Sequence, residues 1–133
     1  MTKIEALAKY LGCDREELDA NDENSFDYRN GRESYLVLTD YEASKLARES
    51  ILDSVWAFNA SFLAAHSDID EDVIKSIQGN NKCEDNNQVF LKLIRDVDYF
   101  INDAIMCDTR GHFLAGYDNE ENEAGEYFVY RIT

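Results

Sequence analysis

The spacing of apolar residues predicts a helix at the start of the chain and a long helix in its middle. Residues 4–11 carry apolar side chains at helical spacing, between the capping box Thr2-Lys3-Ile4-Glu5 and the typical helix stop Gly12. A second capping box, Thr39-Asp40-Tyr41-Glu42, predicts the start of a helix with an apolar stripe over residues 46–62.

Further helices are predicted between residues 68 and 105. Asp68 and Glu71 fit the cap of a short helix that Gly79 closes, and the polar residues 80–88 predict a loop. Apolar residues from 90 to 105 keep the i, i+3, i+4, i+7 spacing over four turns. This pattern predicts one continuous helix.

The pattern also predicts a β-hairpin near each end of the chain. Residues 26–38 contain Asn30-Gly31, the preferred pair for a type I′ turn. Residues 112–117 and 126–132 predict two further strands, joined by the acidic loop 118–125.

Together these elements predict an α+β fold, in which the two hairpins form one small antiparallel sheet packed against the central helices. The acid-rich residues 14–27 are expected to contain a short turn at Asp14 and otherwise to form a loop or a solvated face. No internal repeat or linker divides the 133 residues, so we expect a single domain over residues 1–133.

Composition adds a strong negative charge to this picture. The chain has 28 acidic and 13 basic residues, which gives a formal net charge of −15. Such a charge repels nucleic acids and anionic membranes and attracts basic surfaces. Three segments contain acids and no compensating base, namely residues 68–72, 96–108 and 118–126.

Motifs for metal binding and catalysis are missing from the sequence. An EF-hand loop counted from Asp68 would need Gly and Glu where Val73 and Gly79 stand. Cys107 and His112 could share a zinc ion, but no CxxC or HxxxH pair supplies the other ligands. No nucleophile motif or phosphate-binding glycine loop is present, so we expect a protein that is not an enzyme and that has no metal or cofactor.

The cysteines and the hydropathy indicate a compartment. The three cysteines Cys13, Cys83 and Cys107 are odd in number and far apart, which favours a reducing environment over a disulfide framework. No segment has the length and hydropathy of a membrane span or a signal peptide. A cytoplasmic location is therefore expected.

Several segments resemble parts of a known group of proteins. Residues 35–40, 55–59, 110–118 and 126–132 are similar to segments of small acidic proteins of bacteriophages and other mobile elements. This resemblance implies the cytoplasm of a bacterial host during infection, where small acidic proteins include anti-restriction and anti-CRISPR inhibitors. It implies no activity and no role for any residue.

Charge and resemblance lead to a first functional hypothesis. A surface of carboxylates can imitate the phosphate backbone, since duplex DNA carries one charge per about 1.7 Å of helix axis. We expect an inhibitor that occupies the basic, nucleic-acid-binding site of a host protein such as a nuclease, without contacting nucleic acid itself. The residues expected to bind this partner are Asp118, Glu120, Glu121, Glu123, Asp96, Asp103, Asp70 and Asp72.

Two alternatives stay open. One is an immunity-type or accessory protein that binds one cytosolic partner through mixed apolar and acidic contacts, with Tyr117, Tyr127 and Tyr130 as the main contacts. The other is an enzyme or metal protein built on Cys107, His112 and nearby acids.

Overall fold

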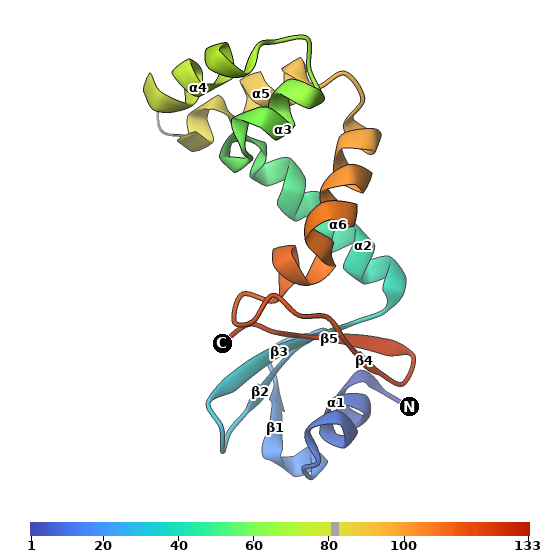
Figure 1. Cartoon of the computed structure of the whole chain (residues 1–133). Coiled ribbons are helices and arrows are strands. Elements are labelled where there is room, and N and C mark those ends of the chain that lie inside the picture. The colour runs from blue at the N-terminus through green and yellow to red at the C-terminus, as the bar shows by residue number, and fades with distance from the viewer. Residues whose placement is uncertain (81–82) are drawn as a thin grey trace. The chain divides into compact units, whose positions relative to one another are not determined.

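The computed structural model describes residues 1–80 and 83–133, which form two compact units (Figure 1). Unit 1 consists of residues 1–47 and 108–133, and unit 2 of residues 48–107. The chain passes from one unit to the other inside α2 (Asp40–Asp53) and again inside α6 (Val97–Leu114). That the whole chain behaves as one domain stays a prediction.

Unit 1 is built on a five-stranded antiparallel sheet with the strand order β1-β2-β3-β5-β4. Its strands are β1 (Leu18–Ala20), β2 (Ser25–Tyr28), β3 (Glu33–Leu38), β4 (Asn122–Ala124) and β5 (Tyr127–Arg131). Pairing of β3 with β5 joins the two ends of the chain, as predicted, with Tyr35 opposite Arg131 and Leu38 opposite Phe128. The predicted α+β fold is confirmed.

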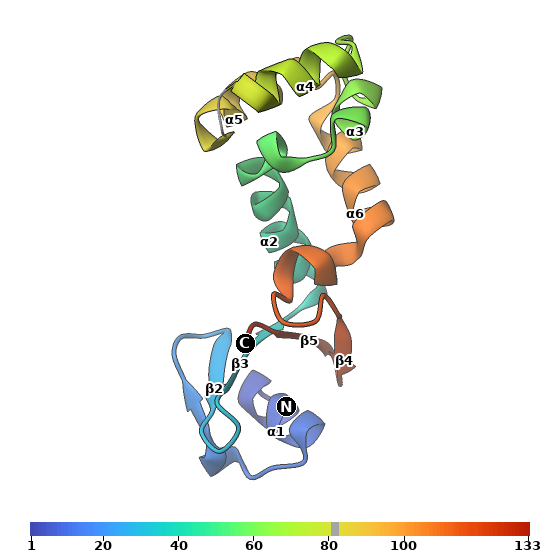
Figure 2. The ribbon, with the colours of Figure 1, turned by 60° about the vertical axis from the view of Figure 1, so that its left-hand side comes forward.

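Apolar clusters lie on the sheet of unit 1. Helix α1 (Lys3–Leu11) packs with Leu7 among the buried strand residues Phe26, Val37 and Val129. Figure 2 shows α1 beside the strands. A second cluster unites Leu38 and Tyr130 of the strands with Ala43 of α2 and with Ala115, the residue that follows α6. Strands of alternating polarity thus bury their apolar residues against short helical segments.

The predicted helix starts near the N-terminus are confirmed by their hydrogen bonds. Thr2 Oγ1 accepts from the Glu5 N–H, and Gly12 ends α1 in the left-handed conformation at φ 70°. At the start of α2, Thr39 Oγ1 accepts from the Glu42 N–H, while Glu42 Oε1 accepts from the Thr39 N–H at 2.9 Å. Both boxes satisfy backbone donors that the first helical turn leaves without a partner.

The turn of the first hairpin differs from the prediction. Tyr28 pairs with Glu33, so the connection has four residues and is not a two-residue type I′ turn at Asn30-Gly31. Positive φ is found at Arg32 (53°) and at neither of those two residues. A Cβ on Gly31 would lie 2.9 Å from Cδ2 of Tyr28, so a larger residue there would require the Tyr28 ring to shift.

The predicted second hairpin is shifted along the chain. Residues 112–114 end α6 instead of starting a strand, and the partner of β5 is β4, inside the segment predicted to be a loop. Gly125, at φ 64°, makes the turn between β4 and β5. Strand β1 likewise forms within the acid-rich segment 14–27, where the predicted turn at Asp14 is the 3₁₀ helix Arg15–Glu17.

Unit 2 is helical. Besides parts of α2 and α6 it contains α3 (Ala60–Ala65), α4 (Glu71–Asn80), α5 (Asn87–Leu93) and the 3₁₀ turns η2 (Val55–Ala57) and η3 (Cys83–Asn86). Helix α2 ends at Asp53, before the predicted stripe does, and α4 passes through Gly79. The core of unit 2 includes Leu63, Ile74 and Phe90.

The continuous helix predicted over residues 90–105 is interrupted. Ile94 is extended and buried, and the Arg95 N–H donates to the carbonyl of His66 at 2.9 Å. The Asp96 carboxylate then accepts from the Tyr99 N–H and begins α6. Because a buried isoleucine fits a helix and an extended turn equally well, the apolar spacing carries no sign of this break.

Gly111→Ala tests the close packing at the end of α6. A Cβ there would lie 2.5 Å from the Asn119 carbonyl oxygen, so we expect a loss of about 1–3 kcal/mol in the free energy of unfolding. Urea denaturation measures this loss. Gly116→Ala is the control in unit 1, because its Cβ would meet only the Ile132 carbonyl oxygen at 3.4 Å. Equal stability of the two variants would contradict the packing.

Glu42→Gln tests the start of α2. The Lys3 ammonium, 2.7 Å from Glu42 Oε1, and the Thr39 N–H lower the pKa of Glu42. Folded Glu42 therefore binds fewer protons than unfolded Glu42, so its stabilisation is present above about pH 4.3 and is lost as the pH falls through the lowered pKa. We expect Glu42→Gln to reduce the urea midpoint at pH 7 and to leave it unchanged below that window. Glu49→Gln, at an exposed position of α2, is the control.

Candidate partner-binding surfaces

The acidic segment 118–126 in unit 1 exposes several carboxylates. Asp118 shapes its start by accepting from the Glu120 N–H at 3.0 Å, and Asn119 adopts a positive φ of 60°. The side chains of Asp118, Glu120 and Glu123 belong to exposed residues. Among the described residues, none of these three forms an ion pair. Their carboxylates therefore contribute to the negative charge at the surface of unit 1.

Glu121 lies in the same segment but is engaged within unit 1. Its Oε1 accepts from Arg110 Nε at 2.8 Å and from the hydroxyl of Tyr130. The same guanidinium donates to Asp40 Oδ1 at 2.8 Å and lies over the Phe128 ring. Burial, together with the Glu121 acceptor, raises the pKa of Tyr130. Glu121 therefore fixes the acidic segment to the start of α2 and to β5.

The backbone next to Arg110 is shaped to bring this segment close. Thr109 breaks α6 with φ 71° and ψ 160°, a region that is essentially restricted to glycine and costs about 1–3 kcal/mol. Gly111 then lets the carbonyl of Asn119 approach to a distance that a Cβ would prevent. The sequence analysis missed this arrangement, because neither a threonine nor a single arginine signals it.

Two of the acids predicted to bind a partner, Asp96 and Asp103, lie in unit 2 and form hydrogen bonds within it. Asp96 caps α6 through the Tyr99 N–H at 3.1 Å. Asp103 Oδ2 lies 2.7 Å from His66 Nε2, and its Oδ1 lies 3.7 Å from Cys107 Sγ. Asp96 and Asp103 therefore add to the negative field of unit 2, and their carboxylates are already hydrogen-bonded.

His66, one of the two histidines of the chain, is only 6% exposed. Its ring lies between 4.8 and 5.2 Å from the ring centroids of Phe62, Tyr99 and Phe100. A buried imidazole that has one carboxylate partner and three aromatic neighbours stabilises the junction of α3 and α6. Only tertiary packing reveals this position.

The remaining predicted acids lie at the start of α4. Asp70 and Asp72 are exposed and, within the described part of the chain, form no ion pair. Their neighbours differ, since Asp68 pairs with Arg95 at 3.0 Å and Glu71 with Lys75 at 3.2 Å. The structure thus places four of the predicted residues in each unit, and in unit 2 Asp70, Asp72 and Asp96 are exposed.

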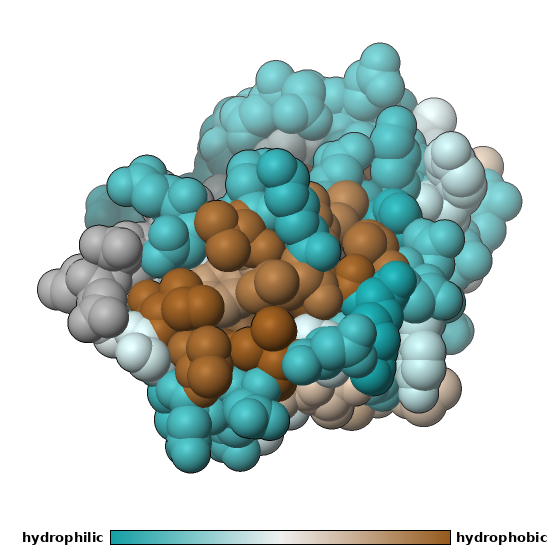
Figure 3. Space-filling model, turned by 90° about the horizontal axis from the view of Figure 1, so that it is seen from above, coloured by the Kyte–Doolittle hydropathy of each residue, from teal (hydrophilic) through white to brown (hydrophobic). Residues whose placement is uncertain are grey.

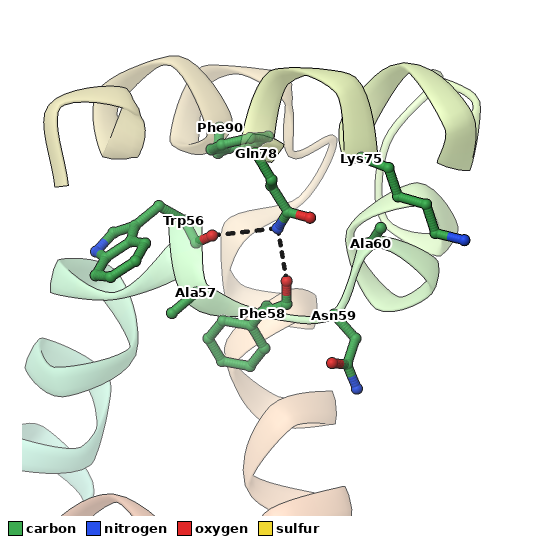
Figure 4. A pocket seen from close by; sticks show the side chains of 8 residues that line it. All are labelled: Trp56, Ala57, Phe58, Asn59, Ala60, Lys75, Gln78 and Phe90. Carbon is green, nitrogen blue, oxygen red and sulfur yellow. Dashed lines mark hydrogen bonds between the residues drawn. The ribbon is translucent and has the colours of Figure 1, made fainter. Parts of the chain in front are cut away.

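Unit 2 also contains an open pocket of about 600 Å³ (Figure 4). The Gln78 side chain crosses it and donates to the carbonyls of Trp56 at 3.2 Å and Phe58 at 2.8 Å. This amide ties α4 to the turn after α2. The lining residues are Trp56, Ala57, Phe58, Asn59, Ala60, Lys75, Gln78 and Phe90.

The tyrosines of the accessory-protein hypothesis differ in exposure. Tyr117 is 59% exposed and stacks under the Arg131 guanidinium at 3.6 Å. Tyr127 is partly buried and donates to the Met1 carbonyl, and Tyr130 is fully buried. Only Tyr117 presents a large surface to a partner.

No family model, curated protein or solved structure matches the chain. Among the described residues, no cluster of three or more His, Cys, Asp and Glu side chains could hold a metal ion. Within the same ranges, no helix has both the length and the hydropathy needed to cross a membrane.

Arg110→Met tests whether the arginine anchors the acidic segment. Removal of the charge leaves Glu121 and Asp40 without their cation, and the side chain is only 13% exposed, so we expect a loss of about 2–4 kcal/mol in stability. Arg29→Met is the control, because Arg29 and its partner Asp19 are both more than half exposed and such pairs contribute about 0–1 kcal/mol. Thermal or urea unfolding compares the two variants, and equal losses would contradict the anchoring role.

Proposed function

We propose that this chain is a non-enzymatic, phage-type inhibitor whose acidic surface occupies the basic, nucleic-acid-binding site of a host protein. The observation that carries the proposal is the set of exposed carboxylates of Asp118, Glu120 and Glu123, which form no ion pair among the described residues. They belong to a segment that Arg110 and Glu121 hold in place from within unit 1.

The electrostatics favour a basic partner over other classes. In each unit acidic residues outnumber basic residues more than twofold, so neither unit offers a basic surface as a whole. A cleft lined by Lys and Arg has evolved to bind phosphates, and carboxylates held in place can bind the same cations. The net charge accelerates the approach of such a partner over distances of about one Debye length.

Anchoring strengthens the case for Glu120 and Glu123 as contacts. A carboxylate on a mobile loop loses conformational entropy when it binds, whereas one on a fixed segment loses less. Glu123 is part of β4, and the preceding turn is fixed by Asp118 and by the close approach of Asn119 to Gly111. Charged residues on short edge strands also prevent edge-to-edge aggregation, a role that needs no partner. The experiment below separates these roles.

A double variant, Glu120→Gln with Glu123→Gln, tests the proposal. Proteins captured by the purified chain from bacterial lysate at low salt are first identified, and each is loaded with a fluorescent 20-base-pair duplex. We expect the wild-type chain to displace the duplex from at least one of them. The double variant should need about 10-fold more protein for half displacement, because it lacks two charge-assisted contacts. Asp118 is kept, since it shapes the turn.

The matched control removes two charges elsewhere in unit 1. Glu16→Gln with Glu23→Gln changes the net charge equally, at exposed positions outside segment 118–126. Displacement by the wild type should weaken as salt rises from 50 to 300 mM. Equal losses in the two double variants, displacement that ignores salt, or no displacement at all would contradict the proposal. A greater loss with Tyr117→Ser would favour the accessory-protein alternative.

A further inference from the structure

Unit 2 carries an exposed apolar surface along α4 and α5, which we call the groove. Val73 and Ile77 lie one turn apart on α4, and Val89 and Leu93 lie one turn apart on α5. Val73 is 49% and Val89 46% exposed, while Ile77 and Leu93 are partly exposed. Figure 3 looks onto α3, α4 and α5 from above, and it shows apolar side chains gathered in one patch between polar ones.

The buried faces of the same two helices explain why the groove is open. Ile74 and Phe90 point into the core and are 1% and 2% exposed. Val73 and Val89, one position before Ile74 and Phe90, are rotated by about 100° from these buried residues, and Ile77 and Leu93, three positions after them, by about 60°. Each helix thus buries one stripe of apolar residues in the core and exposes a second, neighbouring stripe at the surface. Large contiguous apolar patches on a protein surface often mark binding sites.

The charges around the groove select its partner. Asp70, Glu71 and Asp72 stand at its α4 end, and Asp85 precedes α5 at the other. Of the two lysines on these helices, Lys75 pairs with Glu71 and Lys92 lies in the last turn of α5. A second copy of the chain would bring the same acids and a net charge of −15 against them. Charge complementarity therefore favours a partner whose apolar side chains are flanked by Lys or Arg.

We propose that the groove between α4 and α5 binds a basic amphipathic helix of a partner protein. A helix of 10 residues such as α4 is about 15 Å long, which matches about three turns of a bound helix with apolar anchors at i, i+3 or i+4, and i+7. Its apolar side chains contact Val73, Ile77, Val89 and Leu93, and its flanking cations face Asp70, Asp72 and Asp85.

Fluorescence anisotropy with designed peptides tests this proposal. The probe is a labelled 18-residue Leu/Lys peptide with leucines on one helical face, compared with a shuffled peptide of the same composition and with a Leu/Glu peptide of the same pattern. We expect the Leu/Lys helix to bind at least 10-fold more tightly than either comparison peptide. The double variant Val73→Ser with Val89→Ser should weaken its binding at least 10-fold.

Met106→Ser is the matched control, because Met106 is 83% exposed in unit 2 and lies on α6, outside the groove. Both substituted valines are about half exposed, and circular dichroism checks that the variants fold. Equal binding of the shuffled peptide or of the Leu/Glu peptide would overturn the proposal, and so would unchanged binding by the valine variant. A wild-type dimer in analytical ultracentrifugation that the valine variant abolishes would also overturn it, in favour of a second copy.

The proposal for the groove and the proposed function can be tested independently of each other. The Glu120→Gln, Glu123→Gln variant keeps unit 2 intact and should bind the Leu/Lys peptide as the wild type does. The valine variant keeps the carboxylates of segment 118–126.

Discussion

The pairing of β3 with β5 is the contact on which the rest of unit 1 depends. It joins residues 35–38 to residues 128–131 and so closes a loop of about ninety residues, whose entropic cost grows only slowly with length. Strands β2 and β1 then add to β3, and β4 adds to β5, each through a short connection. Unit 2 lies within that closed loop as an insertion between Ala47 and Asp108. Long-range contacts of this kind slow folding, whereas the helices of unit 2 can form locally.

The carboxylates that give the chain its strong negative charge have different roles in the structure. Glu42 and Asp96 accept backbone hydrogen bonds at helix starts, where the helix dipole also favours them. Glu121 and Asp103 are held by Arg110 and His66. The carboxylates left over, such as Glu120 and Glu123, have no task within the fold that the described contacts reveal. Repulsion among these carboxylates lowers the stability of the fold. Solubility or the binding of a partner is the benefit that offsets this cost.

Local sequence signals predicted the parts of the fold that local chemistry controls. The capping boxes at Thr2 and Thr39 and the helix stop at Gly12 are confirmed, because each depends on residues within one turn. The antiparallel joining of the two ends was also predicted, from the hairpins expected near both ends of the chain. Strand β4 was missed because its sequence Asn-Glu-Ala has little β propensity and owes its form to the neighbouring β5.

The sequence predicted which type of residue makes up the candidate site, but not which individual residues are available in it. Sequence composition indicated exposed acids in segment 118–126, but Glu120 and Glu121 look alike until Arg110 is placed beside one of them. The same limit holds for Asp103, whose partner His66 is distant in sequence. The residue types were visible, whereas the pairing that divides engaged carboxylates from exposed ones is a tertiary property.

Charge also decides what an exposed apolar groove can do. An uncharged protein that left Val73 and Val89 half exposed would associate with itself, because burial of apolar surface stabilises any complementary contact. Here every self-association brings acidic surfaces together, and that repulsion acts against identical copies but favours basic partners. In the two proposals made above, the charge that attracts a nucleic-acid-binding protein to Glu120 and Glu123 also selects which helix can reach α4 and α5. Specificity then arises from repulsion of the wrong partner as much as from attraction to the right one.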